Sequence, residues 1–126
     1  MNATSEQDLK AISAINKASE INDEAVELLI EKKIGALDLK LWQIAAELEY
    51  ASFLISATHR LADYFPNLSD VDQNDESLDS LIAKTHEILE NVASILLSSP
   101  KEAYDRAKKA IALVRRAQSI LSETDR

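Results

Sequence analysis

Residues 37–65 read LDLKLWQIAAELEYASFLISATHRLADYF, a segment bounded by the chain's single glycine, Gly35, and by Pro66. At about 100° per residue, one side of this segment carries the continuous apolar stripe that a core-facing helix requires. That stripe consists of Leu37, Leu41, Ile44, Leu48, Ala51, Ile55 and Ala62. We therefore expect a helix over residues 37–65 that ends at Pro66, because proline disfavours the helical conformation of the residue before it.

A second apolar stripe, called the aromatic stripe below, runs along roughly the opposite side of the same helix. Its members are Leu39, Trp42, Ala46, Tyr50, Phe53, Ala57, Leu61 and Tyr64. Trp42, Phe53 and Tyr64 are 11 residues apart, which is three turns at about 3.67 residues per turn, so a nearly straight line is expected. One buried face already satisfies a helix in a bundle. The aromatic stripe therefore predicts a second covering surface: the chain itself, a second copy, or a partner helix or apolar ligand.

Three further helices are expected, over residues 5–33, 76–97 and 100–122. Asn22 falls within the apolar face of the first, and either bonds a neighbouring helix from a buried position or caps a second, shorter helix. Gly35 is expected to provide the turn that follows. Asp75 or Ser77 is expected to cap the third helix, and Ser98, Ser99 and Pro100 predict a sharp bend before the fourth.

Four helices of similar length joined by short turns favour one all-α domain, residues 1–126, folded as an antiparallel up-down-up-down four-helix bundle. Composition supports this fold class. The chain is 46% hydrophobic and 29% charged, which is typical of a globular protein. It has one glycine and two prolines, too few for the many tight turns of a strand-rich fold.

The formal net charge is −8, and such a field repels nucleic acid phosphates. Residues 100–126 differ, with 7 Lys or Arg against 4 Asp or Glu. The basic side chains form one face of the fourth helix, called the basic face below: Lys101, Lys108, Lys109, Arg115 and Arg116. No aromatic side chain is interleaved with them to stack on bases. We expect a solvated face or an acidic protein partner, with a nucleic acid accessory role less favoured.

Two histidines each have a carboxylate four residues later, His59 with Asp63 and His86 with Glu90. Such pairs share a helix face and resemble half of a metal site, although an ordinary hydrogen bond or ion pair explains them better. An acidic bundle with a helical His86 also resembles histidine phosphotransfer domains. That family has lysine and glycine where this chain has Leu89 and Glu90, so the resemblance stops there.

These observations predict a non-enzymatic interaction or regulatory protein, with no catalytic residue set, cofactor or metal. Self-association as a homodimer through the aromatic stripe is the first expectation, and a partner helix is the next. The alternative function is a small-ligand or metal-binding bundle that uses the two His and carboxylate pairs. The chain has no cysteine, the amino terminus is polar, and the longest uncharged stretches are 10 residues, about half of a membrane span. A cytoplasmic location without membrane insertion is expected.

Overall fold

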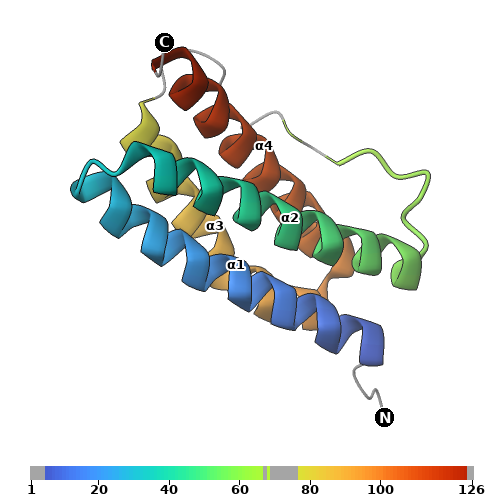
Figure 1. The fold of residues 1–126 in the computed structure, drawn as a ribbon. Coiled ribbons are helices and arrows are strands. Elements are labelled where there is room, and N and C mark those ends of the chain that lie inside the picture. Colours follow the sequence, from blue (N-terminus) through green and yellow to red (C-terminus); the bar gives the residue numbers. More distant parts are fainter. Residues whose placement is uncertain (1–4, 67, 69–76, 125–126) are drawn as a thin grey trace.

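The computed structural model describes residues 5–66, 68 and 77–124, and within them it has four helices and no strand (Figure 1). The helices are α1 (Glu6–Ile30), α2 (Ile34–His59), α3 (Leu78–Ser98) and α4 (Pro100–Thr124). α1 and α4 each pack against both α2 and α3. The helices thus form the four corners of a bundle, with α1 diagonal to α4 and α2 diagonal to α3.

Contacts between distant residues give the direction of each helix. Asn22, late in α1, contacts Ile82 at the start of α3, and Asp8, early in α1, contacts His59 at the end of α2. α1 is therefore antiparallel to both α2 and α3. α4 follows α3 after a single residue and runs back along it, so α4 is antiparallel to α3 and α2 as well, which confirms the predicted all-α antiparallel four-helix bundle. The chain path is up-down-down-up, since α2 and α3 run in the same direction (Figure 1). α2 ends and α3 begins at opposite ends of the bundle, so the observed path differs from the predicted up-down-up-down path, in which a short turn would join them.

α1 is one continuous helix. The hydroxyl of Ser5 caps it by accepting a hydrogen bond from the Asp8 N–H at 3.0 Å. Asn22 is only 1% exposed, and its Nδ2 donates to the backbone oxygen of Ile82 at 3.3 Å. The prediction of a buried asparagine bonded to a neighbouring helix is confirmed, and the alternative of a helix break at Asn22 is wrong.

The turn between α1 and α2 does not use Gly35, contrary to expectation. Lys32 takes the left-handed conformation, with φ 60°, and the Lys33 N–H donates to the Leu28 oxygen at 2.9 Å. This hydrogen bond satisfies one of the free carbonyl groups at the end of α1. α2 then begins at Ile34, so Gly35 lies in its first turn without a positive φ.

α2 ends at His59, six residues before the predicted end at residue 65. Arg60 takes the left-handed conformation, with φ 57° and ψ 50°, and the Leu61 N–H donates to the Ser56 oxygen at 2.9 Å. A left-handed conformation costs a non-glycine residue about 1–2 kcal/mol. Burial of the Leu61 side chain, which is 8% exposed, offsets it by about 2 kcal/mol. The proline rule places the helix end too late because this tertiary contact ends α2 first.

The second half of the bundle follows the sequence pattern closely. Ser77 caps α3 by accepting a hydrogen bond from the Ser80 N–H at 3.1 Å, while Asp75 lies outside the described residues. Ser99 alone separates α3 from α4, as the Ser-Ser-Pro bend predicts. The six residues expected to face inward from α4 are all buried, and Ile111 and Leu113 join them, so half of the buried face is alanine; it consists of Ala103, Ala107, Ala110, Ile111, Leu113, Val114, Ala117 and Leu121.

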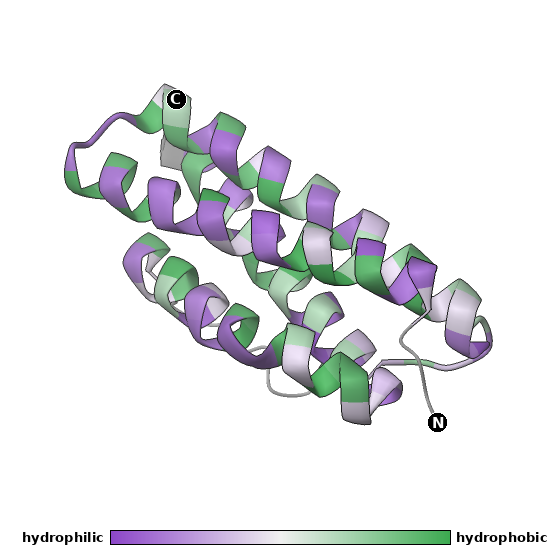
Figure 2. Cartoon of the chain, turned by 90° about the horizontal axis from the view of Figure 1, so that it is seen from below, coloured by the Kyte–Doolittle hydropathy of each residue, from purple (hydrophilic) through white to green (hydrophobic). Residues whose placement is uncertain are grey.

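The core consists of two clusters of buried apolar side chains, one toward each end of the bundle. All seven residues of the expected core stripe of α2 are buried except Ala62, which lies beyond the end of the helix and is exposed. Hydrophobic and hydrophilic residues alternate along each helix in the view of Figure 2, as expected for helices with one buried and one solvated side.

Candidate interaction surface

α2 carries a line of large apolar side chains that its own bundle leaves exposed. The exposed fractions are 55% for Leu39, 59% for Trp42, 48% for Tyr50 and 68% for Phe53. Ala46 and Ala57 are also exposed on the same side of the helix. We call these six residues the aromatic face of α2. Because each of these side chains is exposed, the alternative that the chain itself covers this surface is not met among the described residues.

Two residues of the predicted aromatic stripe lie elsewhere. α2 ends at His59, so the helical period no longer applies to Leu61 and Tyr64. Leu61 is buried in the core cluster that includes Ile55 and Ala103. Tyr64 packs against α4, where its ring centroid is 6.2 Å from that of Tyr104. Of the predicted line of Trp42, Phe53 and Tyr64, only Trp42 and Phe53 therefore remain on the aromatic face.

Tyr64 is held at the start of α4 by polar contacts. Its hydroxyl donates to both carboxylate oxygens of Asp105 at 2.8 Å, and Lys101 Nζ lies 4.8 Å from its ring centroid. The hydrogen bond to Asp105, then desolvation, then the negative charge of the carboxylate raise the pKa of the Tyr64 phenol. These contacts hold the first residues after α2 on the outside of α4, so Tyr64 contributes to the fold.

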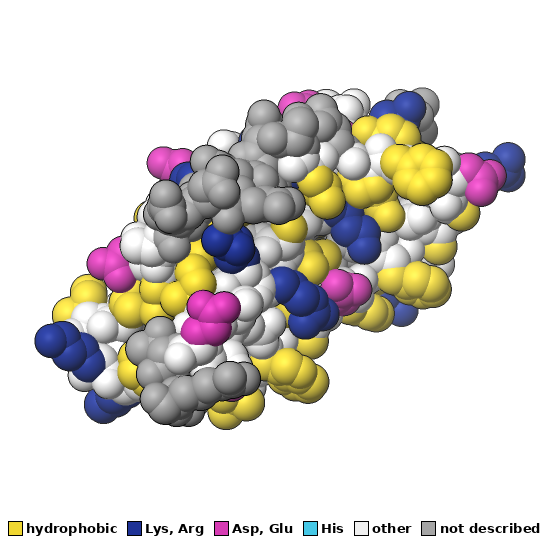
Figure 3. Space-filling model, turned by 90° about the horizontal axis from the view of Figure 1, so that it is seen from above, with side chains coloured by type: hydrophobic (Ala, Val, Ile, Leu, Met, Phe, Trp, Pro, Cys, Tyr) yellow, Lys and Arg dark blue, Asp and Glu magenta, His cyan; other side chains and the backbone are white. Residues whose placement is uncertain are grey.

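Much of the predicted basic face is engaged within the chain. Lys101 lies over the Tyr64 ring, Lys108 Nζ is 5.7 Å from the centroid of Tyr104, and Arg115 pairs with Glu49 of α2 at 3.6 Å. Lys109 and Arg116 are half-buried. On the face shown in Figure 3, Lys and Arg side chains are interspersed with Asp and Glu. Such a distribution differs from the continuous basic stripe of a nucleic acid interface.

The two histidines are not brought together. His59 Nε2 contacts Asp8 at 2.9 and 3.0 Å across the α1–α2 contact, and Asp63 lies beyond the helix, exposed. His86 pairs as expected with Glu90, at 2.9 Å, and also with Asp23 of α1 at 3.5 Å. Among the described residues no group of three or more His, Asp or Glu side chains is placed to hold a metal ion. The predicted alternative ligand set thus lacks a common centre.

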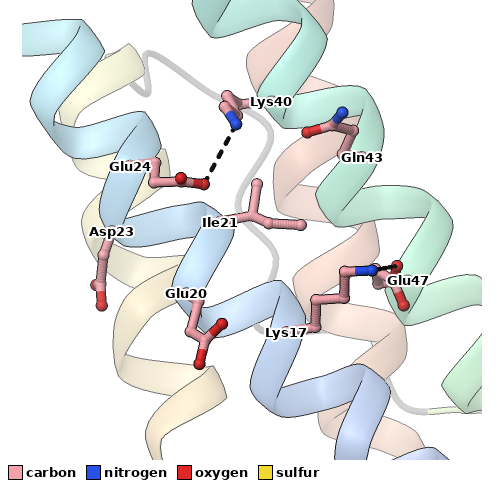
Figure 4. Close-up of a pocket in the computed structure, with 8 residues that line it drawn as sticks. All are labelled: Lys17, Glu20, Ile21, Asp23, Glu24, Lys40, Gln43 and Glu47. Carbon is pink, nitrogen blue, oxygen red and sulfur yellow. Dashed lines mark ion pairs between the residues drawn. The ribbon is translucent and has the colours of Figure 1, made fainter.

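A polar groove between α1 and α2 was not anticipated from the sequence. Its volume is about 570 Å³, and it is lined by Lys17, Glu20, Ile21, Asp23, Glu24, Lys40, Gln43 and Glu47 (Figure 4). Lys17 pairs with Glu47 at 3.5 Å and Lys40 with Glu24 at 3.3 Å, each bridging the two helices. The spacing of charged residues by three or four along each helix is a detectable signal, but it does not reveal which helices are neighbours. The two ion pairs join α1 to α2 at the rim of the groove.

Comparison of the chain with protein-family models, curated proteins and solved structures finds no match in any of the three. None of the helices in residues 5–66, 68 and 77–124 combines the length and apolar character needed to cross a membrane.

Proposed function

We propose that this chain is a non-enzymatic interaction protein that self-associates through the aromatic face of α2. The observation that carries the proposal is the row of four large apolar side chains on one helix, each about half or more exposed. Contiguous exposed apolar patches mark interaction surfaces in proteins that are otherwise polar outside. Trp, Tyr and Phe are also the residues enriched at the centres of protein interfaces.

A second copy is the occupant that we favour, because symmetric dimers are the commonest assemblies. An aromatic side chain carries about 150–250 Å², so the four exposed side chains leave on the order of 500 Å² per copy. Two copies together would cover about 1,000 Å², which is the lower limit for a specific interface. We accordingly expect association in the micromolar range rather than an obligate dimer.

The proposed location follows from composition, and the proposed binding role follows from the surface and the histidine contacts. The sequence has no cysteine, which is typical of proteins in a reducing compartment, and we therefore propose a cytoplasmic location. The proposal of a binding rather than catalytic role rests on the contrast between the aromatic face and the two separate histidine contacts, which ordinary ion pairing explains.

Sedimentation equilibrium tests the proposal. The chain has a mass of 14.0 kDa, and the wild-type protein should approach twice that mass as its concentration rises through the micromolar range. The double variant Trp42→Ala, Phe53→Ala should remain monomeric at concentrations at least about 10-fold higher, because it removes the two most exposed aromatic side chains of α2. Circular dichroism should show an unchanged helix content, since neither side chain is in the core.

Leu97→Ala is the matched control. Leu97 is 62% exposed on α3, outside the aromatic face, so this variant should associate like the wild type. A wild-type protein that stays monomeric up to about 1 mM would overturn the proposal. The same conclusion would follow if the double variant associated as strongly as the wild type.

A further inference from the structure

The order of residue sizes along the exposed side of α2 is the same in both directions about Ala46. Four residues on either side are Trp42 and Tyr50, and seven residues on either side are Leu39 and Phe53. Eleven residues on either side are Gly35 and Ala57, which are both exposed. The sequence of sizes is therefore small, large, large, small, large, large, small.

This symmetry has a geometric meaning for two copies of the helix. When two identical helices cross antiparallel on a two-fold axis, residues at equal distances on opposite sides of the axis face each other. With the axis at Ala46, each large side chain meets a large one and each small residue meets a small one. Small residues at the crossing point also let the two helix backbones approach closely. The spacing of 11 residues between the small positions keeps this line nearly straight along the helix.

The chemistry of the facing pairs agrees with the antiparallel arrangement. Trp42 would lie beside Tyr50 of the second copy, so an indole N–H, which can only donate, meets a hydroxyl that can accept. A parallel pair would instead place two Trp42 side chains, and hence two donors, beside each other. Antiparallel helices also place their dipoles in opposition, which is the favourable arrangement.

We propose that two copies of the chain associate through antiparallel α2 helices on a two-fold axis at Ala46. This inference rests on the proposed self-association and specifies its geometry. The partner of Leu39 is then Phe53 of the second copy, and the partner of Gly35 is Ala57 of the second copy. The three small positions are suitable sites for testing this arrangement, because substituting them leaves all four large side chains of the face in place.

Cross-linking of single-cysteine variants gives a direct test, because the chain has no cysteine of its own. The variants are Gly35→Cys, Ala46→Cys and Ala57→Cys, each treated with a short bismaleimide at concentrations where sedimentation shows the wild-type dimer. A Cβ at Gly35 meets nothing within 4 Å, so this substitution does not disturb the fold. Ala57 is about 16 Å along the helix from Ala46, at about 1.5 Å per residue. Two Ala57 residues are therefore about 33 Å apart in the antiparallel pair but adjacent in a parallel one.

We expect Ala46→Cys to cross-link to itself and Ala57→Cys not to do so. A mixture of Gly35→Cys and Ala57→Cys should give the heterodimeric product, at a yield at least about 10-fold above that of either variant alone. Efficient self-cross-linking of Ala57→Cys would overturn the antiparallel geometry while leaving self-association intact. Failure of Ala46→Cys to cross-link in a dimeric sample would overturn the location of the axis. A protein that sediments as a monomer throughout would overturn both the geometry and the proposed function.

Discussion

The hydroxyl of Tyr64 donates to both carboxylate oxygens of Asp105 at 2.8 Å, joining the segment after α2 to the first turns of α4. This contact guides the chain out of α2 and over the outside of α4. The contact thus holds the residues directly after α2 against α4, a position that helical periodicity does not predict.

The Tyr64 contact makes stability depend on pH in the alkaline range. The pKa of this phenol is raised in the folded protein, so the folded state holds the proton more tightly than the unfolded chain. The stabilisation is fully present below about pH 10 and is lost as pH rises through the folded pKa. We expect the free energy of unfolding, measured with urea, to fall more steeply above about pH 10 in the wild type than in Tyr64→Phe. Asp105→Ala should flatten the curve in the same way, and a wild-type slope in both variants would contradict this role of the contact.

Gly35 is expected to be a site where the fold can be stabilised. It lies in the first turn of α2, has no positive φ, and has open space where a Cβ would be. Gly35→Ala should raise the free energy of unfolding by about 0.5–1 kcal/mol, mainly by restricting the unfolded chain. The matched reverse change, Ala36→Gly in the same turn, should lower it by a similar amount. Destabilisation by Gly35→Ala in thermal unfolding would show that the turn does require glycine.

Asn22 tests how the α1–α3 contact tolerates charge. Its Nδ2 donates to the Ile82 oxygen, while its Oδ1 is buried with no hydrogen-bond partner among the described residues. Asn22→Asp would bury a carboxylate beside the Ile82 backbone oxygen, and we expect a loss of about 3–5 kcal/mol at neutral pH. Asn16→Asp, on the exposed side of the same helix, should change stability by less than about 0.5 kcal/mol. Chemical unfolding of the two variants makes the comparison, and equal stabilities would contradict the buried position of Asn22.

The contact between Asp8 and His59 should couple the start of α1 energetically to the end of α2. The side chains of His59 and Asp8 are 27% and 12% exposed, so their contact is less solvated than a surface pair. We expect a double-mutant cycle of Asp8→Ala and His59→Ala to give a coupling free energy of about 1 kcal/mol. The exposed pair of His86 and Glu90 provides the control and should give less than about 0.5 kcal/mol. Equal coupling in the two cycles would show that burial does not strengthen the first pair.

The fold was predictable from the sequence where local patterns decide it. The buried faces of α3 and α4, the Ser77 cap and the bend at Ser99 all follow from helical periodicity and capping preferences. The ends of α1 and α2 were not predictable, because Lys32 and Arg60 adopt left-handed conformations that their residue types do not favour. Burial of Leu61 offsets the cost at Arg60, and the backbone hydrogen bond from Lys33 to Leu28 accompanies the conformation of Lys32.

The candidate surface was predictable from helical periodicity only as far as α2 extends. Six of the eight residues of the predicted aromatic stripe form the exposed face of α2, because they lie within the helix that the periodicity describes. Leu61 and Tyr64 leave that line where the helix ends. The contact of His59 with Asp8 joins residues 51 positions apart, so a search for carboxylates one helical turn away could not find it.

Fluorescence emission of Trp42 as a function of protein concentration most directly tests whether a second copy covers the aromatic face. Trp42 is the only tryptophan in the chain and is 59% exposed in the monomer, so its emission reports on this face alone. We expect emission typical of water-exposed indole at low concentration and a blue shift as the protein associates, with the same midpoint as the increase in sedimentation mass. Emission that remains typical of exposed indole while the protein becomes dimeric would contradict an interface at the aromatic face of α2.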